Sequence, residues 1–111
     1  RIGQCTPNAT LLIKVAVEVA MGKREAMSIF GTDYPTPDGT GVRDYIHVED
    51  LADAHLCALD YLRGDGESVT LNCGYGHGYS VREVLESVER VHGQPLQVAE
   101  QPRRAGDPPM L

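Results

Sequence analysis

Apolar runs of helix length alternate with shorter apolar runs along this chain, and this alternation is the feature that most limits its fold. The longer runs repeat apolar residues every three or four positions, and the shorter ones have the length of strands. In chain order, we expect a helix over 9–22, a strand over 27–30, an extended segment over 42–48, a helix over 49–62, a strand over 68–72, a helix over 80–92 and a strand over 96–98. Strands that alternate with helices predict the α/β class.

Signals at the ends of these segments support the expected helices. Asn8 or Thr10 could cap the first helix, because short polar side chains accept hydrogen bonds from free backbone amides. Ser80 and Glu83 have the spacing of a capping box, and Gly93 follows the helix that they open. The inner stripe of that last helix is expected to consist of Val84, Leu85, Val88 and Val91.

Length and charge restrict the function classes that fit this chain. Its 111 residues suit one domain, and 41% hydrophobic residues with 23% charged residues are typical of a folded soluble domain. The formal net charge is −6, and the basic residues form no cluster, which argues against a nucleic-acid partner. No apolar run approaches the ~20 residues that span a bilayer.

Cysteine and histidine spacings give no metal or disulfide pattern. Cys5, Cys57 and Cys73 are widely separated, and the four histidines lack the HxxxH and HExxH spacings. We therefore expect reduced thiols and a cytoplasmic protein. The chain starts at Arg1 without a methionine and stops just after a charged loop, so we expect it to be a piece of a longer protein.

The glycine-rich segment Gly74–Gly78 stands where a dinucleotide-binding loop belongs, between an expected strand and a helix. Its spacing does not fit, because the third glycine of G-x-G-x-x-G would fall on Tyr79. No acidic residue ends a second strand about twenty positions later. We interpret the segment as a turn and not as a cofactor site.

Two arginine-bearing segments are candidates for binding an anion. Arg43 could contact a phosphate with two donors, but composition alone favours the alternative that Arg43 and Asp44 pair with other groups in a turn and that Tyr45 belongs to the core. Arg104 and Asp107 lie in a polar loop that could wrap an anion or simply be solvated. No Tyr-x-x-x-Lys motif is present, so the residues alone indicate no activity.

Residues 29–52, IFGTDYPTPDGTGVRDYIHVEDLA, closely resemble the UDP-glucose 4-epimerases, which are extended short-chain dehydrogenases/reductases. The similarity continues through 71–74, Ser80-Val81 and 103–107, and so covers nearly the whole chain. Members of this family have an N-terminal Rossmann domain and a smaller C-terminal domain that binds the nucleotide sugar. The resemblance implies that residues 1–111 are a single C-terminal, nucleotide-sugar-binding domain fragment without the Rossmann domain.

The same resemblance implies substrate contacts at matching positions. Phe30 is expected to pack near the uracil, and the backbone at Ser28 to contact that base. Arg43 and Arg104 are expected to bind the diphosphate, and Asp107 to accept hydrogen bonds from ribose hydroxyls.

The start of the first helix is a further implied contact with the diphosphate or the sugar. The family usually has Asn or His where this chain has Leu11, so only a backbone contact near Leu12 is expected. No catalytic residue is expected within the chain.

The implied reaction is the NAD-dependent interconversion of UDP-glucose and UDP-galactose through a 4-keto intermediate. NAD and the catalytic tyrosine would belong to the N-terminal Rossmann domain of the same protein, which is expected to form a homodimer. The isolated chain would then be inactive, and its contribution would be binding energy that positions the sugar.

Two alternatives remain open. One keeps the enzyme class with another UDP-sugar, such as a pentose or an N-acetylhexosamine. The other is a non-catalytic module that binds UDP or forms a dimer.

Overall fold

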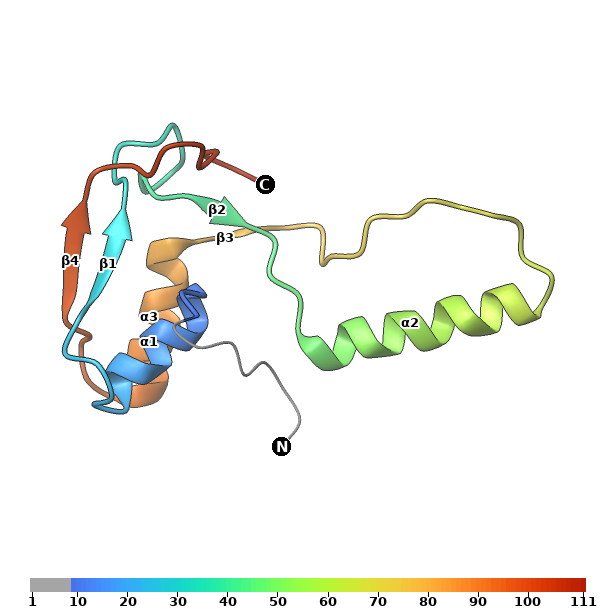
Figure 1. Cartoon of the computed structure of the whole chain (residues 1–111), viewed down its shortest axis with the longest axis horizontal. Coiled ribbons are helices and arrows are strands. Elements are labelled where there is room, and N and C mark those ends of the chain that lie inside the picture. The colour runs from blue at the N-terminus through green and yellow to red at the C-terminus, as the bar shows by residue number, and fades with distance from the viewer. Residues whose placement is uncertain (1–8) are drawn as a thin grey trace.

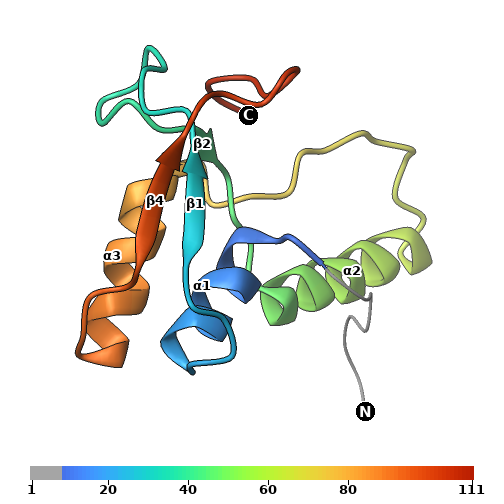
Figure 2. The same cartoon turned by 60° about the vertical axis from the view of Figure 1, so that its left-hand side comes forward.

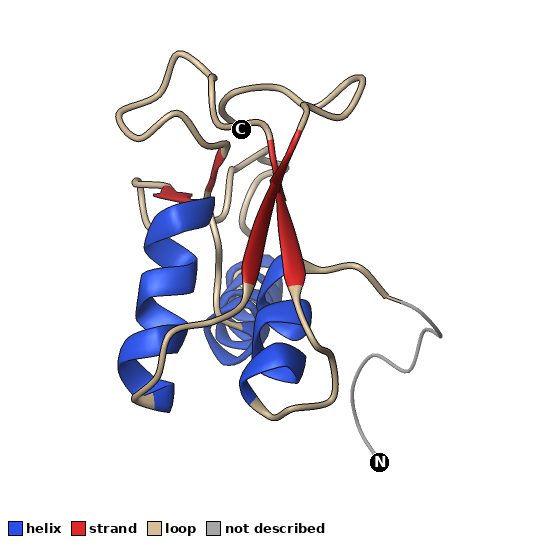
Figure 3. Cartoon of the chain, turned by 90° about the vertical axis from the view of Figure 1, so that its left-hand side faces the viewer, coloured by secondary structure: helices blue, strands red, loops and turns tan. Residues whose placement is uncertain are grey.

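Two strands that are far apart in the sequence form the centre of the structure, a computed structural model that describes residues 9–111. β1 (Met27–Phe30) pairs in parallel with β4 (Val98–Gln101), so that Met27 lies opposite Val98. α1 (Leu12–Ala20) and α3 (Val81–His92) pack against each other, and α1 also packs against β1 (Figure 3). These four elements, called the core unit below, give the α/β arrangement that the alternating pattern predicts.

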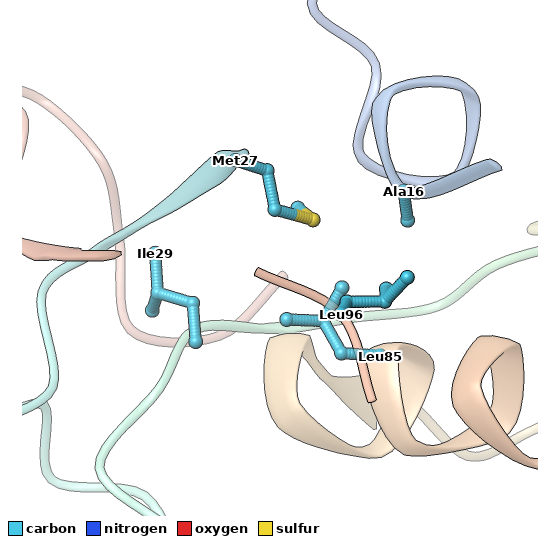
Figure 4. Close-up of a cluster of buried hydrophobic side chains, with 5 residues drawn as sticks. All are labelled: Ala16, Met27, Ile29, Leu85 and Leu96. Carbon is cyan, nitrogen blue, oxygen red and sulfur yellow. The ribbon is translucent and has the colours of Figure 1, made fainter. Parts of the chain in front are cut away.

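The hydrophobic core lies between the strand pair and the two helices. Met27 and Ile29 extend from β1 toward Ala16 of α1, Leu85 of α3 and Leu96, and all five side chains are buried (Figure 4). Burying each of the larger side chains contributes roughly 1.5–3 kcal/mol. The partly buried residues around this centre are Leu12, Val15, Val19, Ala20, Val81 and Val88.

A second, smaller sheet joins the middle of the chain to its end. β2 (Val42–Arg43) pairs antiparallel with β3 (Tyr79–Ser80), with Val42 opposite Ser80. On its other side, Val42 donates from its amide to the Pro109 carbonyl at 2.9 Å and accepts from the Leu111 amide at 3.2 Å. β2 is therefore held between two segments that come from later in the chain.

The ends of α3 confirm the sequence prediction, but within its predicted stripe only Leu85 is buried, Val84 and Val88 are partly buried, and Val91 is exposed. Ser80 and Glu83 form both hydrogen bonds of a capping box, and Gly93 ends the helix with a φ of 82°. Leu85 is buried, whereas Val91 is 87% exposed. At about 100° per residue, Val91 lies roughly 120° around the helix from Leu85, which turns it away from the core.

α2 (Val48–Arg63) extends away from the core unit, as Figure 1 shows. The helix matches the prediction, yet it has no buried residue, and Leu59 on its apolar face is 44% exposed. We call α2 and the segment 64–78 the arm. The radius of gyration is 17.2 Å, against the ~13 Å typical of a compact domain of this length, and the arm accounts for this difference.

The predicted strand over 68–72 is wrong. This part of the arm has no regular structure, and Leu71 in it is 78% exposed. A strand needs a neighbour to accept and donate its backbone hydrogen bonds, and residues 9–111 offer none there. Propensity alone therefore overestimated the order of this segment.

Three other boundaries differ from the predictions. The first helix begins at Leu12, and its N-cap is Leu11 without a side-chain hydrogen bond, so Thr10 is not the cap. Asn8 lies outside the described residues. Only Val42–Arg43 of the extended segment 42–48 is a strand, and the last strand starts at Val98, because pairing with β1 and β3 decides where a ladder exists.

Within residues 9–111, no helix combines the length and hydrophobicity that crossing a membrane requires.

Candidate functional site

A cavity of about 490 Å³ opens beside the carboxyl ends of β1 and β4. The loops that follow these strands lie at the same end of the pair, as Figure 2 shows. This is the edge at which open α/β sheets bind their ligands. The residues that line the cavity are Thr10, Leu11, Leu12, Val15, Arg24, Ala26, Met27, Ser28, Ile29, Phe30, Tyr34, Gly41, Arg43, Tyr45, Val81, Arg104 and Asp107.

The structure brings all the sequence-predicted site residues to this one cavity. They come from the start of α1, from β1, from β2 and from the loop after β4, which are separated by up to ninety-five positions in the chain. This set consists of Leu12, Ser28, Phe30, Arg43, Arg104 and Asp107. Their place is established here, and their individual roles remain predictions.

Phe30 and Arg104 form one wall of the cavity. Phe30 is the last residue of β1, and Arg104 follows β4 by three positions. Because the strands run parallel, both residues emerge at the same edge, and the Arg104 guanidinium carbon lies 3.7 Å from the centroid of the Phe30 ring. This cation–π contact places an aromatic face and a fixed positive charge together.

Arg43 and Asp107 both line the cavity and form an ion pair. An Nη2–Oδ1 distance of 3.7 Å separates them, and Arg43 also donates from Nη1 to the Val42 carbonyl at 2.7 Å. The guanidinium has five N–H donors, so most of them are left for a ligand. The alternative that Arg43 pairs with other groups of the chain is therefore partly met by Val42 and Asp107.

The start of α1 adds a third source of positive potential. Leu11 supplies no side-chain hydrogen bond to the first turn, so the N-cap side chain does not occupy the amides at this end of the helix. Free amides and the helix dipole give a partial positive charge that favours anions. Together with Arg43 and Arg104, this end of α1 makes the cavity suited to a multiply charged anion.

The two consecutive arginines have different positions. Arg103 donates from Nε to the Asp33 carboxylate at 2.6 Å and also donates to the Asp33 carbonyl, and its guanidinium lies 4.3 Å from the centroid of the Tyr34 ring. The hydrogen bond from Arg103 lowers the pKa of Asp33. Of the two arginines, only Arg104 lines the cavity.

Sequence reasoning did not assign Tyr45, Tyr34 or Arg24 to this site. Burial raises the pKa of the half-buried Tyr45, and the nearby Arg43 charge opposes that shift. Tyr34 is only 6% exposed, and its hydroxyl has no hydrogen-bond partner among the described residues. Tyr45 follows Arg43 by two positions, so the two-residue period of an extended chain was a signal that could have identified it. Arg24 is joined to Glu18 at 2.5 Å, and nothing in the sequence pattern indicates its place.

The described residues provide neither a dinucleotide loop nor a metal centre. Gly74–Gly78 lies in the irregular part of the arm and follows no strand, which supports its interpretation as a turn. Residues 9–111 contain no group of three His, Cys, Asp or Glu residues that could hold a metal ion.

The fold and the cavity together give an α/β arrangement with a cavity, lined by Arg43, Arg104 and Phe30, at the carboxyl ends of two parallel strands. A model of the NAD dependent epimerase/dehydratase family matches residues 5–74, which is more than half of the chain. The chain therefore belongs to the NAD dependent epimerase/dehydratase family.

The similar proteins are named as 4-epimerases of UDP-sugars. The chain is 58% identical over 111 residues to a UDP-glucose 4-epimerase of Azospirillum brasilense, covering 100% of this chain and 32% of that protein. A UDP-Glc/GlcNAc 4-epimerase from Campylobacter jejuni is 58% identical with a TM-score of 0.82, and the match covers 98% of this chain and 33% of that one. A UDP-glucose 4-epimerase from Bifidobacterium longum, in complex with NAD+ and UDP, is 44% identical with a TM-score of 0.86, over 95% of this chain and 31% of that one. The chain thus spans about one third of the length of these relatives.

Proposed function

We propose that this chain is the UDP-binding part of a UDP-glucose 4-epimerase, which interconverts UDP-glucose and UDP-galactose. The observation that carries the proposal is the cavity in which Phe30, Arg43, Arg104 and Asp107 meet at the ends of β1 and β4. The names of the relatives point to the same activity.

Each side of the cavity suits one part of UDP. The diphosphate of a UDP-sugar has two negative charges, which the Arg43 and Arg104 guanidinium groups and the positive end of the α1 dipole can share. The Phe30 ring offers an apolar face to the uracil, beside the backbone at Ser28. Asp107 can accept hydrogen bonds from ribose hydroxyls because its carboxylate is an acceptor only.

NAD, in this proposal, is bound by an N-terminal Rossmann domain of the same protein. Residues 9–111 have no dinucleotide loop of their own, and the relatives are about three times as long as this chain. We also propose that this domain covers the exposed apolar face of α2, and that the full-length protein is a homodimer. The free thiols of Cys57 and Cys73 are consistent with a cytoplasmic location.

The direct test is UDP binding by the intact protein, measured by isothermal titration calorimetry. Arg43→Ala should weaken binding about tenfold to a hundredfold, because a charge-assisted contact to a phosphate contributes roughly 1.5–3 kcal/mol. The matched control is Arg63→Ala, which removes an exposed arginine of α2 outside the cavity. Equal affinities for the wild type and Arg43→Ala would refute the proposed site.

A 4-epimerase for another UDP-sugar is the second candidate. The named activity of the Campylobacter jejuni relative includes the N-acetylated sugar, at 58% identity. Comparing turnover of UDP-glucose, UDP-N-acetylglucosamine and UDP-xylose by the intact protein separates these specificities. A protein that binds UDP and converts none of the three sugars would instead be the non-catalytic module.

A further inference from the structure

Asp38 holds together two segments that border the cavity without lining the cavity itself. Its Oδ1 accepts from the Thr40 amide at 2.9 Å and from the Thr40 hydroxyl at 2.8 Å, while its Oδ2 accepts from the Ser80 hydroxyl. Thr40 ends the loop after β1, and Ser80 belongs to β3. We call Asp38, Thr40 and Ser80 the Asp38 latch.

Two of the three residues of the Asp38 latch are buried, and their polar side-chain atoms are hydrogen-bonded. Thr40 is 0% exposed and Ser80 is 4% exposed. The Thr40 carbonyl accepts from the Thr36 hydroxyl at 2.7 Å, and the Ser80 hydroxyl accepts from the Glu83 amide at 3.1 Å. Buried polar groups that lose a partner cost about 1–3 kcal/mol each, so this network fixes one geometry.

Arg43 follows the latch residue Thr40 by three positions in the chain. Thr40 precedes Gly41 and β2, while Ser80 lies opposite Val42 in the antiparallel pair. The Val81 amide also donates to the Gly41 carbonyl at 3.1 Å. The direction of the Arg43 side chain follows from the register of a strand only two residues long, and two residues of ladder are too few to fix that register alone.

From this geometry we propose that Asp38 is a positioning residue for UDP binding, which acts by setting the register of β2 and thereby aiming Arg43 at the diphosphate. The inference rests on the proposed function. Asp38 itself touches neither the cavity nor Arg43, and so it differs from the residues that the motif assigns to substrate.

A double-mutant cycle on UDP affinity in the intact protein tests the latch. Asp38→Ala should weaken UDP binding about tenfold, because neighbouring groups in one network couple by roughly 0.5–3 kcal/mol. In the Arg43→Ala background the same change should weaken binding less than about twofold, since the group that Asp38 positions is then absent. Glu86→Ala, which removes an exposed carboxylate of α3, is the matched control.

Asp38→Asn keeps the test decisive if the alanine variant does not fold. The amide oxygen can still accept from Thr40, and its NH2 group can donate to the Ser80 hydroxyl, so we expect a loss of only about threefold that also vanishes with Arg43→Ala. If an Asp38 substitution weakens UDP binding by the same factor in the wild type and in the Arg43→Ala background, the positioning role is overturned. If Arg43→Ala binds UDP as tightly as the wild type, the proposed function fails. If Arg43→Ala is weakened and Asp38→Ala is not, only the latch fails.

Discussion

The core unit and the arm contain similar helices but bury them very differently. α3 has a capping box and packs Leu85 into the core. α2 is longer, has acidic residues in its first turn and Arg63 in its last, and still buries nothing among residues 9–111. Local signals therefore decide that a helix forms, whereas a partner surface decides whether its apolar face stabilises the fold. Among residues 9–111, only the core unit contains such a surface.

Hydrogen exchange should show the largest difference between the two regions. Backbone amides of β1 and α3 should open only with global unfolding, while those of α2 should open by local fraying. We expect protection factors in the isolated chain to differ by roughly a hundredfold or more, measured by mass spectrometry or NMR. Equal protection in both regions would mean that the arm is packed in solution.

Two leucine-to-alanine substitutions, one in the core unit and one in the arm, test the same difference in burial. Leu85→Ala should reduce the free energy of unfolding of the chain by about 2–5 kcal/mol, because it leaves a cavity in the core. Leu59→Ala in α2 should change it by less than about 0.5 kcal/mol, since this leucine is half exposed. Urea denaturation of both variants gives the values.

The same Leu59→Ala change in the intact protein then tests the partner proposed for α2. A Rossmann domain that covers the helix should raise the cost to about 2 kcal/mol. A cost that stays near zero in the intact protein would contradict that docking.

The two N-caps should differ by a smaller amount. Ser80→Ala removes a side-chain cap of α3 and a contact with Asp38, and should cost about 1–2 kcal/mol of unfolding free energy. His47→Ala in the arm removes a bond to the Glu49 amide of 3.3 Å, and should cost only a few tenths of a kcal/mol. Thermal unfolding followed by circular dichroism compares the two variants, and a larger effect for His47→Ala would contradict the ordering.

Lowering the pH should reduce the unfolding free energy of the core unit through protonation of Asp38. This is the smallest of the expected effects. Partial burial raises the pKa of Asp38, but hydrogen bonds from Ser80 and Thr40 and the nearby Arg82 charge together lower it below its ordinary value of 3.8. The stabilisation is therefore complete above pH 3.8 and disappears as the pH falls through the lower pKa of the folded state. The unfolding free energy of Asp38→Asn should depend less on pH below 4 than that of the wild type. Asp60→Asn in α2 is the control and should keep the wild-type profile.

The sequence predicted the elements better than their boundaries. The Ser80–Glu83 capping box and the stop at Gly93 depend on local chemistry, and the structure has both, while the strand Met27–Phe30 was also predicted with the right bounds although it needs β4 as its partner. The failed strand over 68–72 and the shifted last strand depend on pairing, which one sequence does not specify. Local patterns therefore identify an element more securely than they locate its hydrogen-bonding partner.

For the site, the resemblance to the family indicated six of the residues that line the cavity. Residue chemistry alone had left Arg43 and Arg104 with structural alternatives. Tyr34 was missed because its place depends on how the loop after β1 folds back, and Arg24 because it depends on where α1 ends. These are tertiary facts that a periodicity in sequence does not contain.

The pairing of β1 with β4 also has a consequence for how the site is made. Met27 can pair with Val98 only when that residue has been synthesised, so β1 lacks this partner strand while the whole arm is translated. Closing a loop of this length costs entropy before any contact compensates for it, which slows folding. Phe30 therefore acquires its neighbour Arg104 only after the arm and β4 have been synthesised, so this wall of the cavity assembles later than the helix and strand that begin it.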